Sequence, residues 1–360
     1  MKIKQKEELF NIDITKLDEA VMAKVKAKWD YIAKPLDSLG AFEDIFVKIG
    51  GICGTDAIDV SPAYTLVMCA DNGIIEEGVT QTGSYVTQVV AGEMGMGKSL
   101  SSFMAQSLGA EFVTVDCGME GETPAGVKNK KVRAATRNFK KEPAMTESEV
   151  LAAVNIGIEE VEEIKEKGGK LILIGEMGIG NTTTSSAVIS AISGYFADKV
   201  TGRGAGLSDG ALEKKMKIID EAIEKYGLRN IEDDKNRAFE ALRCVGGLDI
   251  AALCGVCIGG ALYKIPIVLD GLITLAAALC AENMIPGVKD YLIPSHIGKE
   301  RGAKLVSTSM GFSPVIDAQM ALGEGSGALM LYSLLKVTEV LYKSGTEFDD
   351  MGVTKYERFS

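Results

Sequence analysis

Residues 169–188 read GKLILIGEMGIGNTTTSSAV, and this stretch decides the fold. Residues 171–174 form a short aliphatic run typical of a buried strand, and the glycines after it predict a tight loop. A helix should follow, with Asn181 or Thr182 capping its first turn through a side-chain oxygen. Free backbone N–H groups, a helix dipole and glycines that admit an anion together favour a phosphate site at this loop.

A strand-to-helix turn without a ligand is the alternative, because glycine-rich turns of this kind are common. Glu176 favours a ligand site, since a bare turn has no need of a carboxylate among its glycines. This stretch alone leaves both explanations open, and the strand-to-helix order and the carboxylate favour the ligand site.

Composition limits the classes of protein to consider. The chain has 360 residues, 46% of them hydrophobic, which is enough for one large core and at most a small second domain. A net charge of −11 argues against a nucleic-acid partner, because phosphate backbones bind basic surfaces. The N-terminus MKIKQKEELF lacks the apolar core of a signal peptide and no apolar run is long enough for a membrane span, so we expect a cytoplasmic protein.

Apolar runs alternate with helical patterns along the chain. Strands are predicted at residues 64–70, 111–116, 171–174, 266–269 and 291–293, and helices at 12–33, 86–108, 147–167, 211–226 and 272–282. This alternation predicts a parallel sheet covered on both faces. Polar residues end these strands: Asp71, Asp116, Glu176, Asp270 and Ser295. Ligands of such sheets bind at that edge, so these residues are candidates for a site.

Residues 92–99 read GEMGMGKS and satisfy the P-loop pattern, with Lys98 and Ser99 as its functional pair. That pattern needs a strand before it, whereas the apolar spacing predicts a single helix through residues 86–108. A P-loop nucleoside triphosphatase is the rival hypothesis from another enzyme class.

No metal site is predicted. Cys254 and Cys257 form a C-x-x-C pair, but a tetrahedral zinc site needs two more ligands and His296 is the single histidine of the chain. All seven cysteines stand in apolar surroundings typical of a core, and His296 is expected to be a hydrogen-bonded structural group.

Residues 322–329 read LGEGSGAL, with Glu324 between two glycines at the start of an apolar helix. One explanation is a carboxylate that complements the helix dipole. The other is a general base, since the flanking glycines let a substrate approach the backbone. Two carboxylates in glycine-rich loops, Glu176 and Glu324, favour the catalytic explanation.

Seven segments, in order, resemble one known family: KPxxSLGxxE at 34–43, EPAMT at 142–146, GEMGIGNTT at 175–183, GRGAGLSD at 202–209, VLDG at 268–271, PSH at 294–296 and LGEGSGA at 322–328. Through them nearly the whole chain resembles the nicotinate-nucleotide:dimethylbenzimidazole phosphoribosyltransferases of cobalamin synthesis. The resemblance implies that 5,6-dimethylbenzimidazole, or a related lower-ligand base, attacks the ribose C1 of nicotinate mononucleotide, giving α-ribazole 5′-phosphate and nicotinate.

The resemblance also implies roles for individual residues and requires no cofactor. Glu324 matches the general base, and Glu176 would face the ribose and acceptor as a second catalytic carboxylate. The implied nucleotide-binding residues are Gly178, Gly180, Asn181, Thr182, Gly204, Lys215, Ser295 and Gly323. The implied acceptor-binding residues are Thr80, Gln88, Met177 and Leu322.

The family's fold is a doubly wound, Rossmann-like parallel α/β sheet with a smaller helical domain built from both chain ends. The resemblance also implies that the protein is a homodimer. We therefore expect residues 1–60 and 311–360, the latter carrying Glu324, to form the small domain, and residues 61–310 to form the sheet with the nucleotide site.

The chain departs from the family pattern at Asn72, Thr80, Gly298 and Ala303, where histidine, serine, serine and histidine are usual. Gly298 and Ala303 are departures from the family's S-H-x-S-x-E-x-G-H, which residues 295–303 otherwise follow. All four departures belong to the acceptor half. They leave another benzimidazole, a purine or a phenolic compound open as acceptor, and also a non-catalytic subunit that needs a homologous partner chain.

Overall fold

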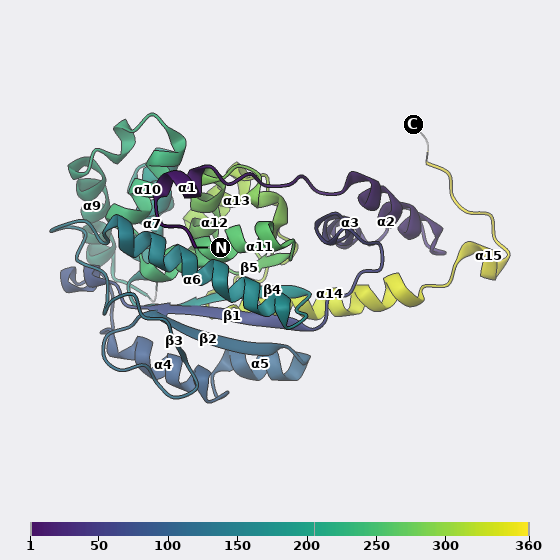
Figure 1. Cartoon of the computed structure of the whole chain (residues 1–360), viewed down its shortest axis with the longest axis horizontal. Helices are drawn as coiled ribbons and strands as arrows, with labels where there is room; N and C mark the ends of the chain where they lie inside the picture. Colours follow the sequence, from purple (N-terminus) through teal and green to yellow (C-terminus); the bar gives the residue numbers. More distant parts are fainter. Residues whose placement is uncertain (1, 205, 359–360) are drawn as a thin grey trace.

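A six-stranded parallel sheet forms the centre of the molecule (Figure 1). The computed structural model describes residues 2–204 and 206–358. The strands are β1 (Ala63–Ala70), β2 (Glu111–Gly118), β3 (Lys128–Asn129), β4 (Leu171–Met177), β5 (Ile267–Leu269) and β6 (Leu292–Pro294). Their spatial order is β3-β2-β1-β4-β5-β6, and every neighbouring pair is parallel. The order reverses between β1 and β4, which confirms the doubly wound, Rossmann-like fold.

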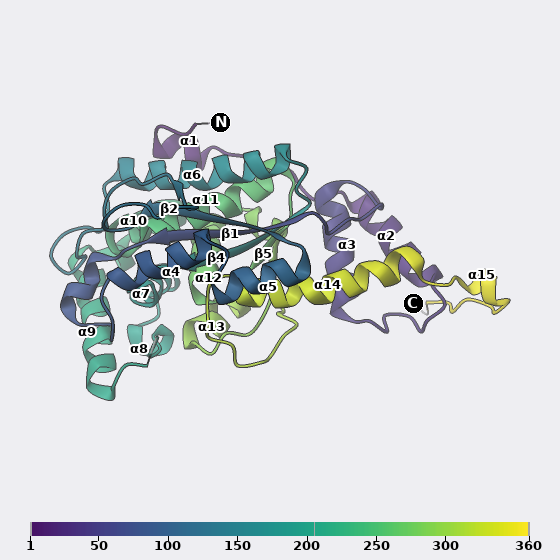
Figure 2. The ribbon, with the colours of Figure 1, turned by 90° about the horizontal axis from the view of Figure 1, so that it is seen from below.

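Helices cover both faces of this sheet (Figures 1 and 2). One face carries α6 (Glu147–Glu166), α7 (Asn181–Ser193), α10 (Asp234–Val245), α11 (Leu248–Tyr263) and α12 (Leu272–Met284). The other carries α4 (Tyr85–Gly95), α5 (Leu100–Leu108) and α14 (Ser326–Ser344). The remaining helices are α1 (Lys6–Phe10), α2 (Glu19–Tyr31), α3 (Ala41–Cys53), α8 (Ala197–Val200), α9 (Asp209–Lys225), α13 (Arg301–Ser309) and α15 (Phe348–Met351).

Strand β4 shows why its sequence is aliphatic without interruption. Ile172 and Ile174 pack into the larger core under α6 and α11, while Leu171 and Leu173 face the opposite side, in the cluster with α14. Successive side chains of a strand point to opposite faces, so a strand buried on both faces needs an apolar residue at every position.

Helices from the two ends of the chain pack together. Rings of Trp29 from α2, Phe46 from α3 and Tyr342 from α14 meet with centroids 5.0–5.8 Å apart. Helix α14 begins at the sheet and extends out to α2 and α3 (Figure 1). Helix α1, by contrast, buries Leu9 in the larger core and lies away from α2 and α3 (Figure 1).

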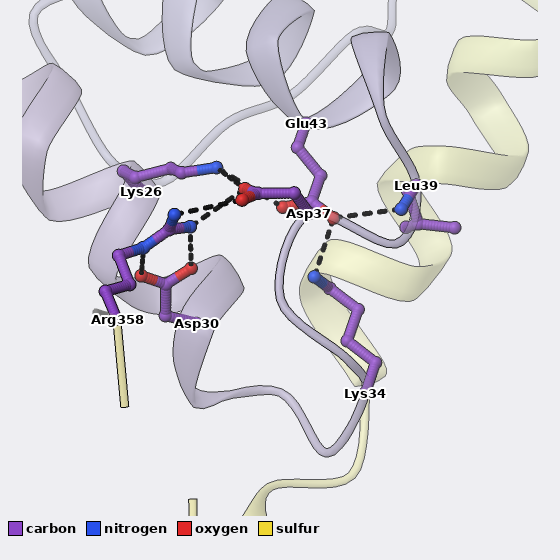
Figure 3. A network of polar contacts seen from close by, with 7 residues as sticks. All are labelled: Lys26, Asp30, Lys34, Asp37, Leu39, Glu43 and Arg358. Carbon is purple, nitrogen blue, oxygen red and sulfur yellow. Dashed lines mark hydrogen bonds and ion pairs between the residues drawn. The ribbon is translucent and has the colours of Figure 1, made fainter. Parts of the chain in front are cut away.

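A network of six charged side chains ties the C-terminal segment to the loop between α2 and α3 (Figure 3). Its members are Asp30, Asp37, Glu43, Lys26, Lys34 and Arg358. Arg358 Nη2 lies 2.8 Å from Asp37 Oδ1, and Lys34 Nζ lies 2.6 Å from the buried Glu43 Oε1. The three carboxylates come within 4.8 Å of one another, but three cationic side chains match their charge, so we interpret the cluster as an ion-pair network.

Two predicted helices differ in the structure. The helix expected at residues 12–33 begins only at Glu19, because the Asp18 carboxylate accepts a hydrogen bond from Val21 N and caps it there. Residues 12–18 instead run against the larger core through Ile14 and Leu17.

The single helix expected at residues 86–108 is wrong as well: α4 ends at Gly95 and α5 begins at Leu100. Gly97 turns the chain with a φ of +69°, and the Ser99 hydroxyl caps α5 by accepting from Ser102 N. Apolar residues keep their helical spacing across this break, which is why the sequence predicted a single helix.

The seven cysteines are all free thiols, and Cys254 and Cys257 are completely buried in α11. Both are therefore core residues, as predicted. Within residues 2–204 and 206–358, no helix has both the length and the apolar character that a membrane crossing requires.

Two glycines let α6 and α11 approach closely. A Cβ on Gly157 would overlap Ala252 O and lie 2.5 Å from Val256 N, and one on Gly255 would lie 2.8 Å from Val154 C. These partners are backbone atoms, so neither helix can yield locally.

We expect Gly157→Ala to lower the free energy of unfolding by about 1–3 kcal/mol, because overpacking outweighs the better helix propensity of alanine. Urea unfolding measures the change. The matched control is Gly210→Ala in α9, where a Cβ meets nothing within 4 Å and no loss is expected. A Gly157→Ala protein as stable as the native one would show that the close crossing is not required.

Candidate functional site

A cavity of about 310 Å³ lies at the carboxyl ends of β4, β5 and β6. The loop after β4 contributes Gly178, Asn181 and Thr182 to its wall, and the loop before α14 contributes Gly323 and Glu324. The two glycine-rich loops singled out in the sequence, well over 100 residues apart, therefore border one space.

The Glu324 loop is held against the sheet by a close backbone approach. A Cβ on Gly175 in β4 would lie 2.5 Å from the carbonyl carbon of Glu324, so only glycine fits at position 175. The Asp270 carboxylate after β5 accepts hydrogen bonds from Gly325 N at 3.1 Å and from Gly327 N at 2.7 Å. Together these contacts fix the loop between the ends of two strands.

Glu324 itself has a φ of +59°, a left-handed conformation that a non-glycine residue adopts only when its surroundings impose it. The Ser101 hydroxyl at the start of α5 donates to Glu324 Oε2 at 2.8 Å. Ser101 is completely buried and does not line the cavity, so this contact orients the carboxylate from within the protein.

Glu176 and Asp249 are two buried carboxylates joined by one amide. Asn181 Nδ2 donates to Glu176 Oε2 and, at 3.1 Å, to Asp249 Oδ2. Burial and then the charge of Asp249 raise the pKa of Glu176 to about 8, and burial raises the pKa of Asp249 to about 7. Glu176 is therefore mostly protonated at neutral pH and can donate a hydrogen bond.

The predicted cap of α7 is wrong. Gly180, with a φ of +94°, is the N-cap residue and has no side chain to cap the helix. The Asn181 side chain donates hydrogen bonds to Glu176 and Asp249 instead. Asn181 N and Thr183 N donate to Gly178 O and Gly180 O, so the Thr182 N–H is the one of this first turn that remains for a ligand within the described residues.

A buried lysine stands at the same end of the cavity. Lys215 Nζ from α9 donates to Thr182 Oγ1 at 3.0 Å and to Gly202 O at 3.4 Å. Burial lowers the pKa of Lys215 to about 8, and the charge of Glu300 opposes that shift. A Cβ on Gly204 would lie 2.8 Å from Thr182 Oγ1, so three segments of the chain converge here.

Different polar groups gather at the two ends of the cavity. Thr182, Gly204 and the head of α7, with Lys215 beneath them, form an end that suits an anion, although the Glu300 carboxylate also lies there. Asp270 and Glu324 form an acidic end beside Glu176, which is mostly protonated. A ligand with a phosphate at one end and positive charge at the other matches this arrangement.

Not every predicted residue lies at the cavity. Met177, Leu322 and Gly323 line it, whereas five predicted residues do not: Thr80, Gln88, Gly180, Lys215 and Ser295. Thr80 Oγ1 donates to Thr82 O and Gln88 Nε2 donates to Glu122 O. Ser295 is buried with its hydroxyl 3.0 Å from His296 Nδ1, the hydrogen-bonded role expected of that histidine. The roles of Thr80, Gln88 and Ser295 remain predictions.

The P-loop segment lacks its required context. Residues 92–99 connect α4 to α5, so a helix and not a strand precedes them, and Lys98 is exposed. The prediction of one continuous helix here is wrong, so it no longer argues against a P-loop. The absence of a strand before residues 92–99 does argue against a P-loop nucleoside triphosphatase.

Three residues at the site escaped the sequence analysis: Ser101, Asp249 and Glu300. Asp249 had a signal, because it is a single acid in the apolar run LDIAALCG. Glu300 also had a signal, because it is the glutamate of the family's S-H-x-S-x-E-x-G-H at residues 295–303, but no role was assigned to it. Ser101 had none, since it acts through a contact with Glu324, more than 200 positions away.

Known proteins resemble this chain in sequence and in fold. A family model described as a phosphoribosyltransferase matches residues 14–353. Proteins named nicotinate-nucleotide–dimethylbenzimidazole phosphoribosyltransferase from Acetivibrio thermocellus and Clostridium acetobutylicum are each 39% identical over 345 residues, which cover 96% of this chain and 97% of theirs. A crystal structure of CobT from Thermus thermophilus matches with a TM-score of 0.87 and 29% identity, covering 94% of this chain and 100% of its own.

The raised pKa of Glu176 predicts a pH-dependent stability. Folding takes up a proton between the ordinary carboxyl pKa of 4.5 and about 8, so stability falls as pH rises through that window. Glu176→Gln should reduce that fall by at least about 1 kcal/mol, since one pKa unit corresponds to about 1.4 kcal/mol. Urea unfolding at pH 5 and pH 8.5 measures it, with the exposed Glu224→Gln as control. Equal losses in native and Glu176→Gln protein would contradict the assignment.

Proposed function

Since the chain belongs to the nicotinate-nucleotide–dimethylbenzimidazole phosphoribosyltransferase family, we propose that its cavity binds nicotinate mononucleotide beside an aromatic lower-ligand base. The enzyme transfers the phosphoribosyl group from the nucleotide to that base, giving α-ribazole 5′-phosphate and nicotinate in cobalamin biosynthesis. The observation that carries the placement of this reaction is the common cavity of Glu324 and the head of α7.

The nucleotide spans the two ends of the cavity. Its phosphate is held by Gly178, Gly180, Thr182, Gly204 and Lys215, where an uncapped helix and a buried ammonium favour a dianion. The pyridinium on C1 then points toward the acidic end. Protonated Glu176 faces the ribose and donates a hydrogen bond to it. Asn181 acts indirectly, because its amide bridges Glu176 and Asp249.

The acceptor lies against apolar side chains. Val90, Met177, Leu272, Ile273, Met320 and Leu322 line the cavity and suit a flat aromatic ring. An unsubstituted benzimidazole, a purine or a phenolic compound fits the same description, so 5,6-dimethylbenzimidazole is one acceptor among those to be tested.

The reaction needs one proton transfer. A ring nitrogen of the acceptor attacks C1, the C1–N bond to nicotinate breaks, and the bonding electrons return to the pyridine nitrogen. The leaving group is already cationic at that nitrogen and needs no acid. Glu324 accepts the N–H proton of the acceptor, with Ser101 holding its other oxygen.

We also propose that residues 1–60 and 311–360 contribute a small helical domain in which α2 and α3 pack on α14, while α1 and residues 12–18 lie against the larger core of residues 61–310. We further propose that two copies of the chain associate. Helices α4, α5 and α14, with the turn between the first two, expose a set of large apolar side chains: Tyr85, Val89, Met96, Leu100, Phe103, Met330, Leu334, Val337 and Val340. Exposed apolar surface of this extent marks an interface. A second copy is the occupant that the family implies, and a homologous chain is the alternative.

The reaction is tested by incubating the purified protein with nicotinate mononucleotide and a panel of benzimidazoles, purines and phenols, with released nicotinate as readout. Glu324→Gln should lower kcat by about 10²-fold or more, the effect of losing a positioned general base. The exposed Glu224→Gln is the control. Release of nicotinate at the native rate by Glu324→Gln would place the base elsewhere, and no release with any acceptor would contradict catalysis by the isolated chain.

Sedimentation equilibrium tests the association. We expect a mass of two chains, and a shift toward one chain in Phe103→Glu/Val337→Glu, with an unchanged circular dichroism spectrum because both side chains are exposed. A single-chain mass for the native protein at micromolar concentration would contradict the homodimer.

A further inference from the structure

One anionic side chain already lies at the end of the cavity assigned to the phosphate. Glu300, at the start of α13, accepts a hydrogen bond from Gly204 N at Oε1, 3.1 Å away. Its Oε2 is buried and makes no hydrogen bond within the described residues. The carboxylate thus uses one of the N–H groups that the nucleotide phosphate needs.

We propose that the Glu300 carboxylate occupies the anion seat of the ligand-free enzyme and leaves it when a phosphate monoester binds. The anion seat is here the Thr182 hydroxyl, the Gly204 N–H and the Lys215 ammonium. The proposal rests on the proposed function, because it takes this seat as the place of the nucleotide phosphate. It makes Glu300 a residue that sets the affinity of the enzyme for its nucleotide.

Gly202 shows how closely the carboxylate is packed. A Cβ on Gly202 would overlap Glu300 Oε2 and lie 2.9 Å from its Oε1, and the three nearest atoms all belong to Glu300. Gly202 does not have a left-handed φ, so its backbone accepts alanine. The present position of Glu300 therefore excludes a side chain there.

Electrostatics favours exchange of one anion for another. Glu300 supplies the negative charge that acts on the buried Lys215 in the absence of ligand, and it partly offsets the cost of burying that ammonium. A phosphate supplies more negative charge and more acceptor oxygens to the same groups. Two anions so close together repel. Moving the Glu300 carboxylate away costs little free energy, because one of its two oxygens makes no hydrogen bond that would be broken.

Calorimetric titration of the full-length protein with inorganic phosphate tests the proposal without using catalysis. Glu300→Gln removes the competing charge, and Gly202→Ala displaces the carboxylate sterically while keeping its charge. Both should bind phosphate and nicotinate mononucleotide about fivefold or more tightly than native protein, as expected for removal of a nearby like charge. Nicotinate riboside, which lacks the phosphate, should bind all three proteins equally.

Two controls complete the design. Lys215→Met should abolish phosphate binding because it removes the cation of the seat, and the distant Gly210→Ala should bind like native protein. Weaker or unchanged phosphate binding by both Glu300→Gln and Gly202→Ala would overturn the proposal, as would the absence of binding by all proteins. If both variants bind phosphate more tightly but no variant or native protein releases nicotinate, the proposed function fails while this inference stands.

Discussion

The site depends on one backbone contact, where the loop carrying Glu324 touches strand β4 at Gly175. There is room for this crossing only because position 175 has no side chain, since a Cβ would lie 2.5 Å from Glu324 C. The Asp270 carboxylate then accepts from two N–H groups of the same loop. A segment from the far end of the chain is thereby fixed at the carboxyl edge of a sheet formed by earlier segments, and α14 extends from it to the N-terminal helices (Figure 1).

That contact also creates the polarity of the cavity. The Glu324 loop adds its carboxylate beside Glu176 and Asp270, while the uncapped helix α7 and Lys215 lie at the other end. In the proposed binding mode, the phosphate of nicotinate mononucleotide lies at the Lys215 end and the pyridinium nitrogen lies on the other side of the ribose, near the carboxylates. The carboxylate of the nicotinate ring balances the pyridinium charge, so it is the phosphate that electrostatics orients.

The sequence predicted the fold because its signals are local: aliphatic runs, polar strand ends and glycine-rich loops. The same local signals identified Glu176 and Glu324. They failed where a side chain serves a distant partner, as with Asn181, which bridges two carboxylates instead of capping α7, and with Ser101 and Glu300. They also failed at the turn between α4 and α5, where the apolar period continues although Gly97 breaks the helix. Tertiary contacts decided each of these positions.

The most direct measurement is a crystal structure of the Glu324→Gln protein with nicotinate mononucleotide and 5,6-dimethylbenzimidazole bound together. Our account predicts the phosphate at Thr182, Gly204 and Lys215, and the acceptor ring against Met177 and Leu322 with one nitrogen near C1 and the other within hydrogen-bond reach of residue 324. A nucleotide bound with its phosphate outside that end of the cavity, or an acceptor separated from residue 324, would contradict it.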